Sequence, residues 1–193
     1  SFLNSFAKLK RELTSANIIA ITGSAGKTSL KNMIRDLLQN FGKTCSSPKS
    51  FNNYLGVPIS LSNLSFDDKF GIFEAGMNRA GEIKNLTKLI RPNIGVITNV
   101  GEAHIENFKN LRFIADAKGE IISNIERNGT IILNRDDKYF NHFEKKAKTN
   151  NLKVVSYGKS NKSDVYLINI SRNNKNFKLI IRVKDQILKL NAK

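Results

Sequence analysis

A turn at residues 22–29, Thr-Gly-Ser-Ala-Gly-Lys-Thr-Ser, lies between an apolar run and a helical pattern. Glycines let backbone N–H groups approach a polyphosphate, and the N-terminus of the following helix carries partial positive charge. Lys27 can then reach the β and γ phosphates, and the Thr28 hydroxyl can bind Mg²⁺. The usual P-loop has a further glycine where this chain has Ile21. We predict a nucleotide-binding loop formed by Gly23, Ser24, Ala25, Gly26, Lys27, Thr28 and Ser29.

Two other residues that could do chemistry lie where apolar runs end. Glu74 closes one such run, and His104 lies just past another. A carboxylate beside a P-loop can bind Mg²⁺ or orient water, whereas the plain alternative is a surface residue at the end of a strand. A lone histidine is more often structural, so His104 by itself proves little. His142, in a lysine-rich segment, is expected at the surface.

A lysine interrupts the apolar face of the helix expected over residues 110–125. This residue is Lys118, and its apolar neighbours on that face are Leu111, Ile114, Ala115, Ile122 and Ile125. Burial would lower the pKa of its amine and favour the neutral form. A neutral amine can react with CO₂ to give a carbamate, which binds metal ions. The alternative is a snorkelling lysine whose ammonium reaches water, and the residues alone leave both open.

The elements that must position these groups alternate between strand and helix. Apolar runs predict buried parallel strands at residues 17–22, 69–76, 93–100, 129–134 and 153–158. A helical stripe between the first two runs consists of Leu30, Ile34, Leu37, Leu38 and Phe41, and we expect Gly42 to close that helix. This alternation predicts an α/β fold with a doubly wound, mostly parallel sheet. Ligands of such sheets bind at the carboxyl ends of the strands, where the candidate groups converge.

The domain organisation follows from the same patterns. We expect residues 1–16 to form a helix or linker, residues 17–160 the P-loop core, and residues 161–193 a small antiparallel β annex of the same domain. No apolar stretch reaches the roughly 18 residues of a membrane span, so no membrane partner is expected. A single cysteine, Cys45, agrees with a reducing, cytoplasmic location. We expect a monomer.

The net charge of +16 favours polyanionic ligands such as nucleotides. The lysines are spread along the chain without a nucleic-acid-binding motif, so nucleic acid is not the expected partner. A basic P-loop NTPase acting on nucleic acid is nevertheless one alternative, and a non-catalytic interaction domain is another.

Several motifs follow one another between about residues 17 and 140. They are TGSAGKTS, SFNNYLGVPIS, EAGMNRAGEIKNLTKLIRPNIGVITNVGEAHIENF, IADAKGEI and IILNRDD. Together they resemble the central ATPase domain of the Mur ligases. NNYLGVP and GEI resemble the branch that adds D-alanyl-D-alanine (D-Ala-D-Ala) to a UDP-N-acetylmuramoyl-tripeptide in peptidoglycan synthesis. The alternatives within this resemblance are another Mur-type ligase or folylpolyglutamate synthase.

The resemblance implies an ATP-dependent ligase that forms an amide bond through an acyl phosphate, with two Mg²⁺ sites. Lys27 and Thr28 would hold ATP and the first Mg²⁺, with Glu74 sharing that metal. His104 and a carbamylated Lys118 would serve the second metal.

Four further residues would bind nucleotide or substrate by the same resemblance. Asn134 and Asp137 would contact the nucleoside, while Asn52 and Asn53 would lie near the γ-phosphate and the acyl substrate. The resemblance also implies N- and C-terminal domains that this sequence lacks. The first helix would then pack onto the core through Phe2, Phe6, Leu9 and Leu13.

Overall fold

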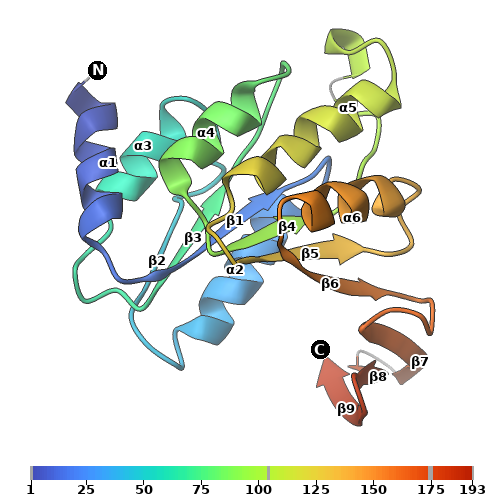
Figure 1. Cartoon of the computed structure of the whole chain (residues 1–193). Helices are drawn as coiled ribbons and strands as arrows, with labels where there is room; N and C mark the ends of the chain where they lie inside the picture. Colours follow the sequence, from blue (N-terminus) through green and yellow to red (C-terminus); the bar gives the residue numbers. More distant parts are fainter. Residues whose placement is uncertain (1, 104, 174–175, 193) are drawn as a thin grey trace.

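The computed structural model describes residues 2–103, 105–173 and 176–192, which form one layered α/β arrangement (Figure 1). The α-helices are α1 (Phe2–Leu13), α2 (Lys27–Leu38), α3 (Gly56–Ser62), α4 (Glu82–Ile90), α5 (Leu111–Lys118) and α6 (Phe140–Thr149). Two 3₁₀ helices are η1 (Ile105–Asn107) and η2 (Gly119–Asn124). The strands are β1 (Asn17–Thr22), β2 (Thr44–Ser46), β3 (Phe70–Glu74), β4 (Ile94–Ile97), β5 (Thr130–Asn134), β6 (Lys153–Gly158), β7 (Val165–Asn173), β8 (Asn176–Val183) and β9 (Gln186–Ala192). Among the described helices, none is long and apolar enough to cross a membrane.

The strands form one sheet in the order β2-β3-β1-β4-β5-β6-β7-β8-β9. Pairing is parallel from β2 to β7 and antiparallel between β7, β8 and β9. The predicted α/β class, with a mostly parallel sheet followed by antiparallel strands, is confirmed. Because β1 lies between β3 and β4, the loops after these three strands meet at one edge of the sheet.

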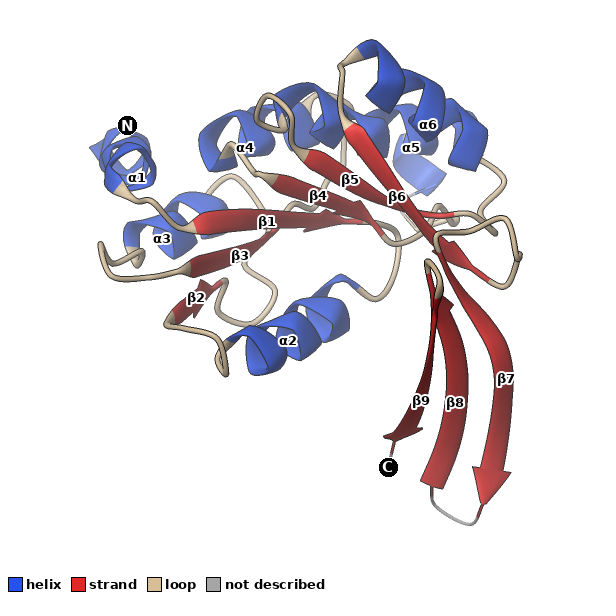
Figure 2. Ribbon diagram, turned by 60° about the horizontal axis from the view of Figure 1, so that its bottom comes forward, coloured by secondary structure: helices blue, strands red, loops and turns tan. Residues whose placement is uncertain are grey.

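Helices cover the two faces of the sheet unequally. Figure 2 shows α2 below the parallel strands and α3, α4, α5 and α6 above them. The larger apolar cluster lies on the upper side, and a smaller one joins Ile21 and Ile72 to Leu30 and Ile34 of α2. Burial on both faces explains the continuous apolar runs of β1, β3 and β4. β5 alternates between buried and half-buried residues, and the predicted burial of residues 153–158 is wrong, because β6 is mostly half-buried.

Helix α2 is shorter than predicted, and part of its stripe does not enter the core. It ends at Leu38, because the side-chain amide of Asn40 donates to the carbonyls of Asp36 (3.2 Å) and Leu37 (3.0 Å). Leu37 and Phe41 are exposed. The expected closure of this helix at Gly42 is therefore wrong by a few residues.

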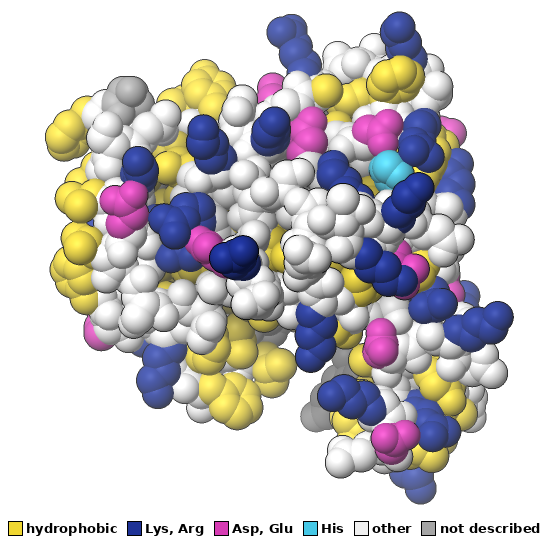
Figure 3. All heavy atoms as spheres, viewed as in Figure 1, with side chains coloured by type: hydrophobic (Ala, Val, Ile, Leu, Met, Phe, Trp, Pro, Cys, Tyr) yellow, Lys and Arg dark blue, Asp and Glu magenta, His cyan; other side chains and the backbone are white. Residues whose placement is uncertain are grey.

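Helix α1 packs through the face opposite to the one expected. Ala7 and Arg11 are buried, whereas the stripe of Phe2, Phe6, Leu9 and Leu13 is exposed. Figure 3 shows apolar side chains along the edge formed by α1 and below, over α2. The predicted packing of that stripe onto the core is wrong for this structure.

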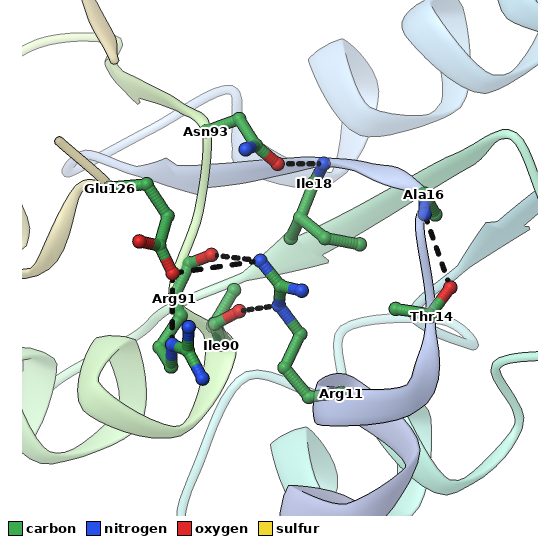
Figure 4. Close-up of polar contacts among 8 residues, drawn as sticks. All are labelled: Arg11, Thr14, Ala16, Ile18, Ile90, Arg91, Asn93 and Glu126. Atoms are coloured by element: carbon green, nitrogen blue, oxygen red, sulfur yellow. Dashed lines mark hydrogen bonds and ion pairs between the residues drawn. The ribbon is translucent and has the colours of Figure 1, made fainter. Parts of the chain in front are cut away.

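The orientation of α1 follows from one arginine (Figure 4). Arg11 Nε donates to the carbonyl of Ile90 at 2.7 Å, and its Nη2 donates to that of Arg91 at 2.6 Å. These carbonyls belong to the C-terminus of α4, where a cation is favourable. Glu126 lies 3.9 Å from the same guanidinium. An arginine buried against these acceptors determines which side of α1 faces inward.

The helix expected over residues 110–125 changes its winding in the middle. α5 ends at Lys118, and η2 continues as a 3₁₀ helix. From η2 the Glu120 carboxylate accepts hydrogen bonds from the amides of Gly81 (2.6 Å) and Lys84 (2.9 Å) at the start of α4. A carboxylate at a helix N-terminus is stabilising, and this contact comes from tertiary packing rather than from the local sequence.

Candidate active site

The Gly-Lys-Thr turn joins β1 to α2 and needs its glycines. Gly26 precedes α2 with φ +81°, a left-handed conformation that favours glycine. At Gly23 a Cβ atom would lie 1.8 Å from Thr98 Oγ1, so no larger residue fits. Lys27 Nζ donates to the Gly23 carbonyl at 2.8 Å, and burial lowers the pKa of this lysine while Glu74 opposes the shift.

The segment after β4 lies directly on this turn. The amide of Ser24 donates to Asn99 O, and the amide of Ala25 donates to Asn99 Oδ1, both at 3.0 Å. The Ser24 hydroxyl also donates to Gly101 O at 3.0 Å. Two predicted phosphate-binding amides therefore already have protein partners. The first amides of α2 have no acceptor within the helix and are the ones available to an anion.

Glu74 is buried beside Thr28 and is not a surface residue. The Thr28 hydroxyl donates to Glu74 Oε2 at 3.1 Å, and Glu74 is 0% exposed. A hydroxyl and a carboxylate are the hard oxygen ligands that Mg²⁺ prefers when it is shared with phosphates. The pair fits the first predicted metal site.

Sequence reasoning missed a buried cation beside Glu74, Lys31. Its Nζ lies 3.1 Å from Glu74 Oε1, and its side chain is 1% exposed. The signal was available in principle, because Lys31 lies four residues after Lys27 and hence on the same side of α2. Its pairing with Glu74 could not be inferred from that spacing alone.

A cavity of about 400 Å³ lies next to the turn and brings several predicted residues together. Its lining includes Lys27, Asn52, Asn53 and Lys118. These residues come from α2, the segment before α3, and the end of α5. One cavity therefore receives side chains from three parts of the chain.

Lys118 is 2% exposed, so its ammonium does not extend into bulk water as a snorkelling lysine would. Burial, together with the charge of Lys27, lowers the pKa of Lys118 to about 8. A substantial fraction of this amine is therefore neutral in mildly alkaline solution. This state is the one that carbamate formation requires.

The pKa of Lys118 makes stability depend on pH in a definite direction. The ordinary lysine pKa of 10.5 falls to about 8 in the fold, so between these values the unfolded chain binds the additional proton. The free energy of unfolding should therefore rise with pH over this window. We expect Lys118→Met to be more stable than the parent chain by on the order of 3 kcal/mol at pH 7 and to lose this advantage by pH 10.5.

Urea unfolding across this pH range, in buffers freed of CO₂, measures the effect. Lys148→Met is the matched control, because Lys148 is an exposed lysine paired with Glu144 on the surface of α6. A constant difference between Lys118→Met and the parent across the range would contradict the expectation.

The other predicted site residues either do not line this cavity or lie outside the residues that the structure describes. His104 lies outside the described residues. Asn134 lines a separate cavity of about 310 Å³ with Tyr157 and Tyr166. Both carboxylate oxygens of Asp137 accept backbone amides, from Val100 at 2.7 Å and Tyr139 at 2.8 Å. Asp137 therefore stabilises the segment after β4, which contacts the Gly-Lys-Thr turn.

Carboxylates are sparse around the turn. Within the described ranges, no three His, Cys, Asp or Glu side chains come together as a ready metal cluster. His142 pairs with Asp116 at 2.9 Å, between α5 and α6. Any metal at the turn would take most of its ligands from phosphate, water and the pair of Thr28 and Glu74.

A glycine turn at the start of a helix, a lysine within it and a buried carboxylate at the neighbouring strand end define a P-loop nucleotide-binding α/β domain. The chain belongs to the Mur ligase family, because the model described as "Mur ligase middle domain" matches residues 21–193.

Comparison with individual proteins agrees with this family. A UDP-N-acetylmuramoyl-tripeptide–D-alanyl-D-alanine ligase of Buchnera aphidicola is 37% identical over 179 residues, which are 93% of this chain and 38% of that protein. The crystal structure of MurF from Acinetobacter baumannii superposes with a TM-score of 0.91 at 27% identity, covering 98% of this chain and 41% of that one. MurF ligase from Thermotoga maritima, solved in complex with ADP, gives a TM-score of 0.87 at 27% identity, with 99% and 44% covered. The chain thus spans about two fifths of the length of these proteins.

Proposed function

We propose that this chain is the ATP-binding central part of a cytoplasmic ligase that joins D-Ala-D-Ala to a UDP-N-acetylmuramoyl-tripeptide. The γ-phosphoryl group of ATP would pass to the terminal carboxylate of the tripeptide, giving an acyl phosphate and releasing ADP. The amine of D-Ala-D-Ala would then attack that carbonyl and release phosphate, leaving an amide bond. Further domains of the full-length protein would supply the rest of the substrate and amine sites.

The observation that carries this proposal is the shared cavity of Lys27, Asn52, Asn53 and Lys118 beside the pair of Thr28 and Glu74. Lys27 would leave the Gly23 carbonyl and neutralise charge on the transferring phosphoryl oxygens. Asn52 and Asn53, which line the same cavity, would orient the acyl substrate. Catalysis would then depend mainly on the positioning of the reactants and on electrostatic stabilisation.

Mg²⁺ would be held by Thr28 and Glu74, and it would supply charge neutralisation at the phosphates. We propose that Lys118 carries a carbamate. Its neutral Nζ would attack the carbon of CO₂, forming an N–C bond and losing one proton to solvent. The product is a carboxylate that would serve a second Mg²⁺ together with His104.

Asn134 is proposed to contact the nucleoside from the cavity that it shares with Tyr157 and Tyr166. The Asp137 carboxylate accepts hydrogen bonds from the amides of Val100 and Tyr139. We therefore propose that Asp137 affects nucleotide binding indirectly, by holding the segment after β4 against the Gly-Lys-Thr turn. The name and identity of the Buchnera aphidicola protein favour the D-Ala-D-Ala-adding branch over other Mur-type ligases and folylpolyglutamate synthase. Membership of the ligase family argues in the same way against an NTPase acting on nucleic acid.

Phosphate release from ATP by the full-length gene product tests the proposal. We expect rapid release only when UDP-N-acetylmuramoyl-tripeptide and D-Ala-D-Ala are both present, with one amide formed per phosphate. Release that ignores both substrates and responds instead to DNA or RNA would show the proposal to be wrong. An absence of any stabilisation by ATP with Mg²⁺ would favour a non-catalytic domain.

A further inference from the structure

The buried ammonium of Lys31 joins two segments that flank the candidate active site. It lies 3.1 Å from Glu74 Oε1, donates to Ser47 O at 2.8 Å, and also donates to Lys49 O. Two of the three ammonium protons have these carbonyls as acceptors, and the contact with Glu74 Oε1 is an ion pair. The side chains of Lys31 and Glu74 are 1% and 0% exposed, so this charge pair is removed from water. Its mutual attraction and the two carbonyl acceptors of Lys31 offset the cost of burying the charges.

On one side, Lys31 restrains the carboxylate at the strand end. Glu74 uses Oε1 for Lys31 and Oε2 for the Thr28 hydroxyl, 3.1 Å away. With both oxygens engaged, the carboxylate has little freedom to rotate. Its Oε2 edge therefore stays directed at the first turn of α2, where phosphates would lie.

On the other side, Lys31 restrains the segment that leads from β2 to Asn52 and Asn53. Lys49 has φ +45°, a left-handed conformation that is strained for a residue with a side chain. Its carbonyl is one of the groups that Lys31 holds. Further along, Asn52 O accepts the amide of Gly76 at 2.8 Å, so the segment lies against the end of β3. Asn52 and Asn53 then line the cavity.

We infer that Lys31 is a positioning residue that couples the Mg²⁺ site at Thr28 and Glu74 to the acyl-substrate wall at Asn52 and Asn53. The identity of the two ligands rests on the proposed function, whereas the coupling itself rests on the contacts of Lys31. Lys31 touches neither ligand. It acts through the Glu74 carboxylate and through the carbonyls of Ser47 and Lys49.

The first experiment needs no ligand. Amide hydrogen exchange is compared between the full-length gene product and its Lys31→Met variant, which removes the charged group and keeps an unbranched side chain of nearly the same length. We expect peptides covering residues 47–53 to exchange about tenfold faster or more in the variant, because the strained segment loses its anchor. Arg35→Met is the matched control, since Arg35 lies one turn further along α2 and forms an ion pair with its neighbour Asp36 at 2.8 Å. Unchanged exchange at residues 47–53 in Lys31→Met would overturn the inference.

The second experiment separates the metal from the nucleotide. In Lys31→Met, the Mg²⁺ concentration for half-maximal phosphate release should rise about tenfold, the size of effect typical of residues that orient a ligand. The KM for the UDP-N-acetylmuramoyl-tripeptide should rise as well, while the KM for ATP at saturating Mg²⁺ changes by less than about threefold. A general loss of structure would raise all three constants together, and that result contradicts the inference. If the parent protein releases no phosphate, the proposed function fails, and the exchange experiment still decides the part played by Lys31.

A buried carboxylate without its cation can prevent folding. If Lys31→Met does not fold, the double variant Lys31→Met/Glu74→Gln removes both charges at once. Recovery of folding in the double variant supports the inference, because it shows that Lys31 acts through Glu74. Failure of the double variant to fold any better than the single one overturns it.

Discussion

Replacing Lys27 by alanine in the full-length gene product is expected to lower substrate-dependent phosphate release from ATP by on the order of 10³-fold. Lys27 begins α2, lines the 400 Å³ cavity, and is half-buried against the Gly23 carbonyl. The flexible side chain of Lys27 can stay close to the negative charge as that charge shifts between the phosphoryl oxygens during transfer. Backbone amides alone would still bind the nucleotide, so we expect a larger effect on kcat than on the KM for ATP.

Lys43→Ala is the control for this prediction. Lys43 is exposed, pairs with Asp67 at 2.8 Å, and lies before β2, at the end of the sheet opposite to the turn. Removing it takes away the same charge without touching the cavity, so the rate should stay within about twofold of the parent. A Lys27→Ala enzyme that keeps a tenth or more of the parental rate would contradict the assignment of Lys27. Its rate would be about 10²-fold higher than expected for the loss of such a group.

Replacing Lys118 by alanine is expected to lower the same rate by about 10²- to 10³-fold, the range typical of removing one group that stabilises the transition state. Lys118 is buried in the cavity wall with a pKa of about 8, and its proposed carbamate would be a carboxylate rather than a cation. Lys118→Arg should therefore be as inactive as Lys118→Ala, because a guanidinium keeps positive charge at every accessible pH. Rates measured with and without added bicarbonate, and ¹³C NMR after labelling with ¹³C-bicarbonate, provide the measurement.

The two variants of Lys118 separate two chemical roles. A carbamate predicts a ¹³C resonance that is present in the parent and absent from Lys118→Ala, and a rate that falls when CO₂ is removed. An arginine variant that retains most of the activity would show that the site requires a cation, and the carbamate would then be rejected. Lys118→Glu places a carboxylate on a shorter side chain and should recover part of the loss.

Much of the fold could be predicted because its signals are local. Apolar runs at 17–22 and 153–158 coincide with β1 and β6. β1 is buried on both faces, which requires continuous apolar sequence, whereas β6 is mostly half-buried, with Ser156 as its buried residue. The run at 93–100 is longer than β4, because Thr98 and Asn99 turn away to bond the P-loop. The short strand β2, Thr-Cys-Ser, has no apolar run of its own and forms by pairing with β3.

Some features of the candidate site could also be predicted from the local sequence, and others depend on tertiary packing. The glycine spacing before Lys27 and the apolar neighbours of Lys118 are visible in the sequence, since turn geometry and helical periodicity each need only nearby residues. The partner of Glu74 is not visible. Lys31 and Glu74 are separated by 43 positions along the chain, and only the packing of α2 against the sheet brings them within 3.1 Å.

By itself, the amino-acid sequence determined the alternation of strands and helices, the phosphate-binding turn and the presence of a lysine on an apolar helix face, because each depends on residues within a few positions of one another. The tertiary structure decided which face of α1 turns inward, where Arg11 and not the phenylalanine stripe meets the C-terminus of α4. It also decided that Lys31 holds Glu74 and that Asp137 braces the loop after β4. Buried polar groups take whichever partners the packed elements bring within hydrogen-bonding distance, and this choice is made across the whole fold.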